Sequence, residues 1–181
     1  MNDSRKAREI NDYFSNSMEE PFPVTKASEV EGSVDDDELV PLVRCIAEAA
    51  DMRKAEDIVC IRVSKLTTTT NFVVLCSGNS RPQNQAIAGA IQDEVEEVFG
   101  EQYGLRGPKP EGNADSGWIL LDFGSVMCHV MTPRSRLFYD IEGKWKKGET
   151  LDIDDILLPN NAGSSSTGAT GEIDVNDPFW S

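Results

Sequence analysis

Histidine is almost absent from this chain of 181 residues, which contains only His129, and its four cysteines include no C-x-x-C pair. Structural and catalytic zinc sites need three or four clustered ligands, usually Cys or His. The sequence therefore predicts no metal site. Cys45, Cys60, Cys76 and Cys128 are scattered along the chain, and three of them lie in apolar runs. We expect these cysteines to act as small, buried hydrophobic residues of a protein in a reducing compartment.

Long apolar runs are also missing. No stretch reaches the eighteen or more apolar residues of a membrane-spanning helix, and residues 1–6 lack the apolar core of a secretory signal. The first twenty residues are too acidic for an intact organellar transit peptide. Either the protein stays where it is made, or a presequence has already been removed.

Basic residues are scarce outside the middle of the chain. Residues 1–40 carry eleven Asp and Glu against four Lys and Arg, and residues 149–181 carry seven acids and no base. Residues 41–148 are nearly neutral, with fourteen acids and thirteen bases. Because phosphate neutralisation supplies most non-specific affinity for nucleic acid, direct RNA or DNA binding is not expected. Acidic flanks favour a partner with a basic surface.

Three regions follow from composition. We expect residues 1–35 to be an acidic, mobile N-terminal segment, 36–147 to be one folded domain, and 148–181 to be an acidic, Gly- and Ser-containing tail. The tail ends in Asp177-Pro178-Phe179-Trp180-Ser181. Two interpretations of these aromatics remain open: a docking peptide, or a terminus that folds back on its own domain.

Periodicity predicts the elements of the domain. A helix capped by Asp36-Asp37 should run to about Lys54, and the β-branched runs 58–63 and 72–76 should be adjacent central strands. Ser80 with Gln83 begins a second helix, which should end at Gly100 and be followed by a loop over 100–117.

Residues 118–131 read as two apolar strands joined by a tight polar turn, which we expect to form a rigid sheet edge that a partner binds. Thr132-Pro133 then opens a helical segment to about Trp145. The expected fold is α/β (α+β), with a mixed sheet of about four to five strands flanked by helices.

Six segments, in order and at consistent spacing, resemble the Iojap family of ribosomal silencing factors over about residues 40–147. They are Lys54–Val59, Leu66–Val74, Ser77–Ser80, Gln85–Ala88, Gly117–Val126 with His129, and Arg136–Glu142 with Trp145. Two departures from the family pattern are Asn71-Phe72-Val73 and Arg81-Pro82-Gln83. They put in doubt any role of those polar positions beyond holding the fold.

The resemblance implies a nucleotidyltransferase-like fold and a protein without cofactor that binds the large ribosomal subunit through large-subunit ribosomal protein fourteen. Occupying that face would block subunit joining and repress translation. Family members often form homodimers when free. The acidic flanks and the Phe179-Trp180 end have no counterpart in short bacterial members, which favours the chloroplast stroma over the mitochondrial matrix or a bacterial cytoplasm.

By this resemblance the partner-binding residues are Trp118, Leu120, Asp122, Phe123 and His129. Trp118 is either an exposed aromatic anchor or a core residue that must pair its indole N–H. The carboxylate of Asp122 either caps the turn or pairs with a basic partner side chain. A single histidine on an apolar strand is more often structural than a ligand or a base.

Arg134 and Arg136, with Lys144, Lys146 and Lys147, form the one basic concentration of the domain. They either line a solvated helix face or contact rRNA phosphates around the docking site.

Two alternative functions remain. A large-subunit assembly factor would use the same surface, and a nucleotidyltransferase-like enzyme would need paired carboxylates to hold divalent metal ions. Asp122 has no second acid two residues away, so we predict no catalytic residues.

Overall fold

The computed structural model describes residues 32–103, 111–113 and 116–158, and in this part of the chain a mixed sheet forms the centre. Its strand order is β3-β4-β5-β2-β1-β6. Strands β2 and β5 are parallel, and the other neighbours are antiparallel. The strands are β1 (Glu56–Arg62), β2 (Phe72–Ser77), β3 (Glu111–Asn113), β4 (Trp118–Asp122), β5 (Val126–Met131) and β6 (Glu149–Thr150).

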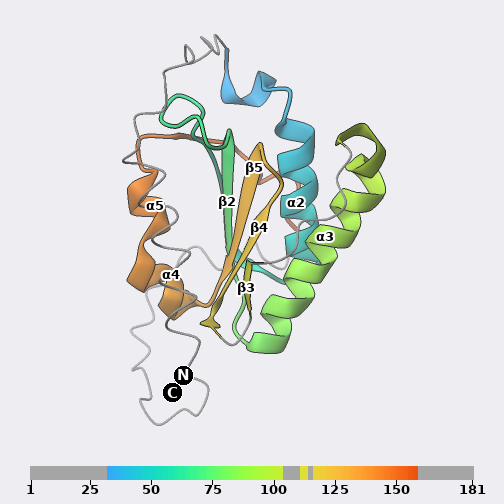
Figure 1. The fold of residues 1–181 in the computed structure, drawn as a ribbon, viewed down its shortest axis with the longest axis vertical. Coiled ribbons are helices and arrows are strands. Elements are labelled where there is room, and N and C mark those ends of the chain that lie inside the picture. Colours follow the sequence, from blue (N-terminus) through green and yellow to red (C-terminus); the bar gives the residue numbers. More distant parts are fainter. Residues whose placement is uncertain (1–31, 104–110, 114–115, 159–181) are drawn as a thin grey trace.

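Helices cover both faces of the sheet, with α2 and α3 on one side and α4 and α5 on the other (Figure 1). The described helices are the 3-10 helix η1 (Val34–Asp36), α2 (Val40–Met52), α3 (Arg81–Tyr103), α4 (Pro133–Tyr139) and α5 (Ile141–Lys144). The predicted fold class is therefore confirmed. Two short edge strands, β3 and β6, were not predicted and bring the sheet to six strands.

Local sequence signals predicted some helix ends correctly and others incorrectly. The Ser80 hydroxyl accepts the Gln83 N–H at 3.2 Å, and Gln83 Oε1 accepts the Asn79 N–H at 2.8 Å, so the predicted cap of α3 is confirmed. The helix continues past Gly100 to Tyr103. The predicted start of α2 is too early, because the helix begins at Val40; Asp37 Oδ1 accepts the Leu39 N–H at 3.0 Å in the turn before it.

The predicted helix after Thr132 is present but divided. Thr132 caps α4 by accepting the Ser135 N–H, as expected. Asp140 then adopts a left-handed conformation with φ 43°, which ends α4, and its carboxylate caps α5 by accepting the Gly143 N–H. The single helix predicted to reach Trp145 is therefore two short helices that meet at a corner.

The two faces of the sheet carry separate cores. The α2–α3 side holds the larger cluster, which includes Leu42, Ile46, Ile87 and Ile91. The opposite side holds a smaller one, here called the Trp118 cluster: Ile61, Val63, Val73, Leu75, Trp118, Leu120, Met127, Met131, Ile141 and Trp145. Strands β1, β2, β4 and β5 each contribute to both cores, because successive side chains point to opposite faces.

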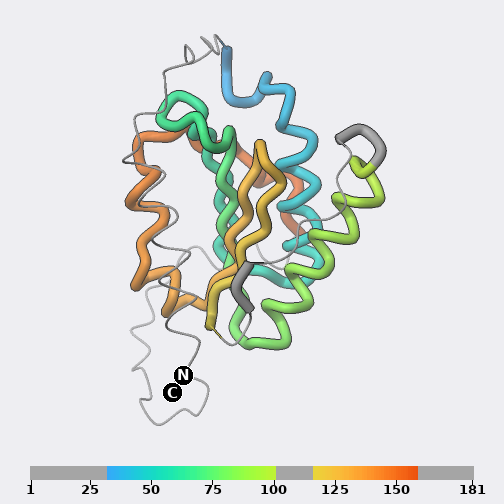
Figure 2. The backbone as a smooth tube through the Cα atoms, viewed as in Figure 1, coloured from blue at the N-terminus to red at the C-terminus, as the bar shows by residue number. Residues whose placement is uncertain are grey.

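The chain beyond α5 still belongs to the folded unit. It crosses from the α4–α5 side to run beside α2 (Figure 2). Leu151 and Ile153 are buried in the larger core, and the Leu158 N–H donates to Asp51 Oδ2 at 2.7 Å. The folded unit therefore extends past the boundary expected at residue 147.

Three of the four cysteines, Cys60, Cys76 and Cys128, are buried and Cys45 is half-buried; all four are free thiols. Burial raises the pKa of Cys60 to about 12, so this thiol stays protonated and unreactive at neutral pH. The predicted role as small core residues is confirmed for the three buried ones. None of the described helices is both long and apolar enough to cross a membrane.

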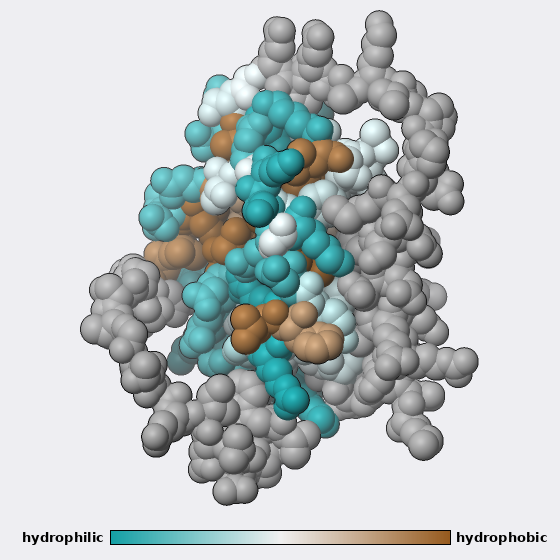
Figure 3. Space-filling model, turned by 90° about the vertical axis from the view of Figure 1, so that its left-hand side faces the viewer, coloured by the Kyte–Doolittle hydropathy of each residue, from teal (hydrophilic) through white to brown (hydrophobic). Residues whose placement is uncertain are grey.

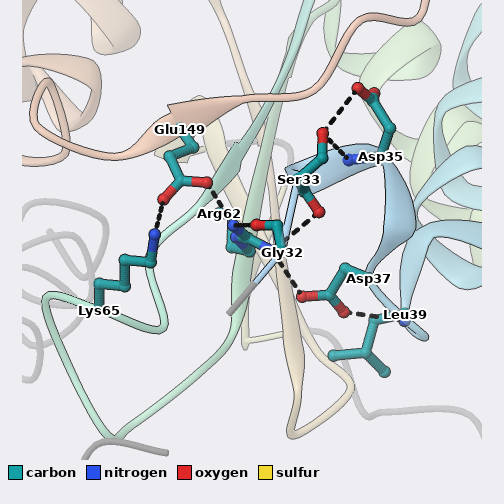
Figure 4. Close-up of polar contacts among 8 residues, drawn as sticks. All are labelled: Gly32, Ser33, Asp35, Asp37, Leu39, Arg62, Lys65 and Glu149. Carbon is teal, nitrogen blue, oxygen red and sulfur yellow. Dashed lines mark hydrogen bonds and ion pairs between the residues drawn. The ribbon is translucent and has the colours of Figure 1, made fainter. Parts of the chain in front are cut away.

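A buried cation joins three distant parts of the chain at the β1–β6 edge of the sheet (Figure 4). The Arg62 side chain is 1% exposed and pairs with Asp37 at 3.3 Å and with Glu149. It also donates to the backbone carbonyl oxygens of Gly32 and Ser33. The same Glu149 pairs with Lys65 at 2.6 Å, and hydrogen bonds from Lys65 and Arg62 lower the pKa of this carboxyl.

Removing the Arg62 side chain should destabilise the folded protein. Arg62→Met leaves the buried Asp37 carboxylate without its partner, so we expect the free energy of unfolding in urea to fall by about 3–5 kcal/mol. Lys65→Met is the matched control, because the Lys65 side chain is 55% exposed and should contribute less than about 1 kcal/mol. Equal effects of the two substitutions would contradict this account of the cluster.

Candidate functional site

The predicted hairpin exists, but it does not form an edge of the sheet. Strand β4 lies between β3 and β5, and β5 lies between β4 and β2. The turn is closed by the Phe123 N–H, which donates to the Val126 carbonyl at 2.9 Å. Strand β5 is therefore paired on both sides, and β4 is paired with β3 over residues 118–120, so the expectation that the hairpin forms an edge of the sheet is wrong.

The predicted contact residues do not share an exposed face. Trp118 and Leu120 point to the α4–α5 side, whereas Phe123 packs in the larger core on the opposite side. All three are buried, as is His129. The expectation of Trp118 as an exposed aromatic anchor is therefore wrong in the monomer: the indole fills the core beneath α4 and α5, where Tyr139 and Ile141 come from those helices.

Trp118 and His129 form a buried polar pair. The indole N–H of Trp118 donates to His129 Nδ1 at 3.1 Å, which requires the neutral tautomer with its proton on Nε2. Burial, with a smaller repulsion from Lys144, lowers the pKa of His129 to about 3. The imidazole is thus neutral at physiological pH and satisfies the indole, so the structural interpretation of this histidine is supported.

Asp122 caps the turn of the hairpin. Its Oδ1 accepts the Gly124 N–H at 2.8 Å, and Gly124 has φ 79°, a left-handed conformation that glycine adopts without strain. This is the Asx-type turn that one interpretation of the sequence anticipated. The carboxylate is only half-buried, which leaves its second oxygen able to reach a partner.

Arg136 holds α4 against the end of the sheet. Its Nη1 donates to the backbone carbonyl of Asp57 at 2.7 Å and to Ser77 Oγ at 3.1 Å, and its Nε donates to Glu142 at 2.6 Å. The side chain is 12% exposed. The guanidinium therefore serves the fold, which corrects the expectation that Arg136 reaches rRNA phosphates; Arg134, two residues earlier, is exposed.

The hydrogen bonds of Arg136 determine which side chains of α4 face the solvent. Residues 136 and 139 both face inward, so Leu137 and Phe138 must face outward, and they are 84% and 79% exposed. With Arg134 they occupy positions i, i+3 and i+4, which adjoin on a helix. We call Arg134, Leu137 and Phe138 the α4 surface. Figure 3 views this side of the molecule, where hydrophobic patches lie among hydrophilic residues.

A row of rings connects the α4 surface to the core. Phe138 contacts Tyr139 edge-on with ring centroids 5.0 Å apart, Tyr139 lies 4.7 Å from Trp118, and Trp118 bonds to His129. The exposed ring of Phe138 is therefore held by its neighbour before any partner arrives. Such preorganisation lowers the entropy lost on binding.

Sequence reasoning missed Leu137 and Phe138, although one signal was available. When the residues before and after two adjacent large apolar residues of a short helix face the sheet, the two apolar residues must face away from it.

No group of three or more His, Cys, Asp or Glu side chains that could hold a metal ion occurs among the described residues.

The burial of Trp118 changes what its substitution should do. Trp118→Ala should lower the free energy of unfolding by about 3–5 kcal/mol, because it leaves a cavity beside His129 and Tyr139. Trp118→Phe should cost about 1–3 kcal/mol, since His129 Nδ1 then loses its donor. Urea titration measures both; an unchanged midpoint for Trp118→Ala would contradict the buried position.

The neutral His129 should make stability depend on pH. The folded pKa of about 3 lies below the ordinary 6.5, so the unfolded chain binds a proton first as pH falls. Stability from this group is complete above about pH 6.5 and declines toward pH 3, by at most about 1.4 kcal/mol per pH unit. Unfolding of the protein and of His129→Gln, compared across pH 4–7, measures this slope. A slope equal in the variant would rule out His129 as its source.

The sequence matches a family described as "Ribosomal silencing factor during starvation" over residues 36–175. It is 32% identical over 113 residues to the ribosomal silencing factor RsfS of Bacillus subtilis, covering 62% of this chain and 92% of that protein. It is also 32% identical over 158 residues to the chloroplastic protein Iojap of Arabidopsis thaliana, covering 84% of this chain and 63% of that protein.

Solved structures show the same similarity. A crystal structure of a Chromobacterium violaceum protein is 30% identical, with a TM-score of 0.55, and covers 65% of this chain and 93% of that one. A Bacillus halodurans structure is 28% identical, with a TM-score of 0.51 and coverage of 62% and 98%. Since the family match spans most of the chain, this protein belongs to the ribosomal silencing factor family that includes RsfS and Iojap.

Proposed function

We propose that this protein binds the large ribosomal subunit through large-subunit ribosomal protein fourteen and blocks subunit joining by occupying that face. Family membership supports the silencing role, because relatives carry the name ribosomal silencing factor. The structural observation that carries the docking site is the exposed pair Leu137 and Phe138 on a helix clamped by Arg136.

The α4 surface has the character of an interface centre. Single exposed apolar residues are common on any protein, but here two adjacent ones stand on a fixed helix, and one is an aromatic ring supported by Tyr139. Aromatic anchors and Arg side chains dominate binding energy at interfaces. Arg134 and the exposed Asp140 supply polar groups beside them, as expected of a polar rim.

The hairpin contributes to this site indirectly. Trp118 and His129 support Tyr139 from below, so the residues that the resemblance singled out hold the docking helix in place. Asp122 lies at the far end of β4 from Trp118, so we assign it to the turn and leave direct contact to α4. Arg134 is the residue of this group that we assign to peripheral rRNA phosphates.

The chloroplast is the compartment that we propose. The Arabidopsis relative and a maize relative, 33% identical over 108 residues, are both named chloroplastic. The free chain is proposed to form a homodimer. A large-subunit assembly role would use the same docking surface; depletion that causes precursor particles to accumulate in growing cells would favour it over silencing.

The α4 surface can be tested directly. Leu137→Ala with Phe138→Ala should weaken binding to purified large subunits roughly 30-fold or more, as expected when an interface loses about 2 kcal/mol. Co-sedimentation through sucrose gradients measures binding, and light scattering measures whether subunits still join. The fold should survive, because both side chains are exposed.

Val98→Ala is the matched control, because Val98 is an exposed apolar residue of α3 on the opposite side of the sheet. It should leave binding unchanged. Equal binding by the α4 variant and the Val98 variant would move the docking site elsewhere, and failure of the intact protein to bind free large subunits would refute the proposed function itself.

A further inference from the structure

We propose that the C-terminal segment of this chain, residues 172–181, docks on the α4 surface and competes with the ribosomal partner for it. This inference rests on the proposed function for its regulatory consequence. The docking itself does not depend on which partner the surface binds. The protein would then carry a built-in competitor for its own binding site.

Composition matches the segment to this surface. Residues 172–181 contain three acids, no base and the two aromatics Phe179 and Trp180. The α4 surface offers two exposed apolar side chains beside Arg134. Lys146 and Lys147, just after α5 on the same side of the sheet, are exposed as well. Asp140 at the end of α4 is exposed too, but the three basic residues outnumber it. The acidic and aromatic residues of the segment would therefore meet a mainly basic and apolar surface, and such complementarity selects a register.

The outer face of α3, on the opposite side of the sheet, is unsuited to this segment. The outer face of α3 exposes a group of acids that would repel it: Asp93, Glu94, Glu96 and Glu97. Its exposed apolar residue, Val98, lies among them. Charge therefore directs an acidic peptide away from the outer face of α3 and favours the α4 surface.

The chain is long enough to make the contact. The last described residue, Leu158, is bonded to Asp51 near the C-terminal end of α2. Residues 159–171 can span at most about 45 Å when fully extended. That exceeds the length of α3, the longest described helix, which is about 35 Å for its 23 residues, so the linker is long compared with the elements of the domain.

Weak intrinsic affinity suffices for an attached segment. A short linker holds a ligand at an effective concentration in the millimolar range, so a segment with Kd of about 1 mM would occupy the surface half of the time. An external partner would then bind about twofold more weakly than to the open surface. A segment Kd of about 0.1 mM would raise that factor to about tenfold.

This arrangement would distinguish the chain from its shorter relatives. The Bacillus subtilis protein is matched over 92% of its own length, yet the match covers only 62% of this chain. The outer segments of this chain therefore have no counterpart there. Control of the docking surface by such a segment would be an addition to the shared domain.

The first experiment needs no ribosome. In the full-length protein labelled with nitrogen-15, Phe179→Ala with Trp180→Ala should shift the amide signals of Arg134, Leu137 and Phe138 and leave that of Val98 unchanged. A synthetic peptide of residues 172–181, added to this double variant, should restore the shifts in a saturable manner. Its affinity should fall as salt rises.

Two controls define the contact. The same peptide with alanine at positions 179 and 180 should leave the α4 signals in place, and the peptide should not shift them in a protein that also carries Leu137→Ala and Phe138→Ala. Signals that move on α3, or no movement on α4 with the intact peptide, would overturn the proposal.

The second experiment separates this inference from the proposed function. Full-length protein with Phe179→Ala and Trp180→Ala should bind large subunits about twofold to tenfold more tightly than the unchanged protein. If the peptide shifts α4 but Leu137→Ala with Phe138→Ala binds subunits normally, the docking proposal stands and the proposed partner site fails. If Leu137→Ala with Phe138→Ala abolishes subunit binding and the peptide shifts no amide signal of α4, the docking proposal fails and the proposed partner site stands.

Discussion

The hydrogen bonds of Arg136 determine which side of α4 this protein presents. A helix of seven residues has little stability of its own, and α4 has no fully buried side chain. Its position depends on one guanidinium that joins the Asp57 carbonyl, the Ser77 hydroxyl and the Glu142 carboxylate. Because these donors are fixed in a planar fork, they set the rotation of the helix as well as its location. The two apolar residues that follow Arg136 therefore have only solvent to face.

The Trp118 cluster supports the same helix from inside the domain. The indole N–H of Trp118 bonds to His129 and its ring packs against Tyr139 of α4, so one side chain contributes to the core and supports α4. His129 suits this position because desolvation keeps it neutral, and a neutral imidazole can accept a hydrogen bond where a charged one cannot. Residues that resemble a binding motif in the sequence thus support α4, whose exposed side chains we propose as the docking surface.

Sequence alone predicted those features that short-range chemistry determines. The caps at Ser80 and Thr132, the hairpin turn at Asp122 and the buried strand β2 each follow from residues within a few positions of one another. The sequence could not show that α4 and α5 cover the Trp118 side of the hairpin, because this depends on contacts of Arg136 with residues about sixty and eighty positions away. Strands β3 and β6 were not predicted because they have only three and two residues, which is too short to show a periodic pattern.

The Arg62 cluster has a consequence for how the protein can be divided. Arg62 is bound by residues from both ends of the domain. Gly32, Ser33 and Asp37 come from its N-terminal end, and Glu149 comes from its C-terminal end. A shortened version that begins after Asp37 or stops before Glu149 would strand a desolvated cation in the interior. A piece that keeps all of these contacts must include residues 32–149.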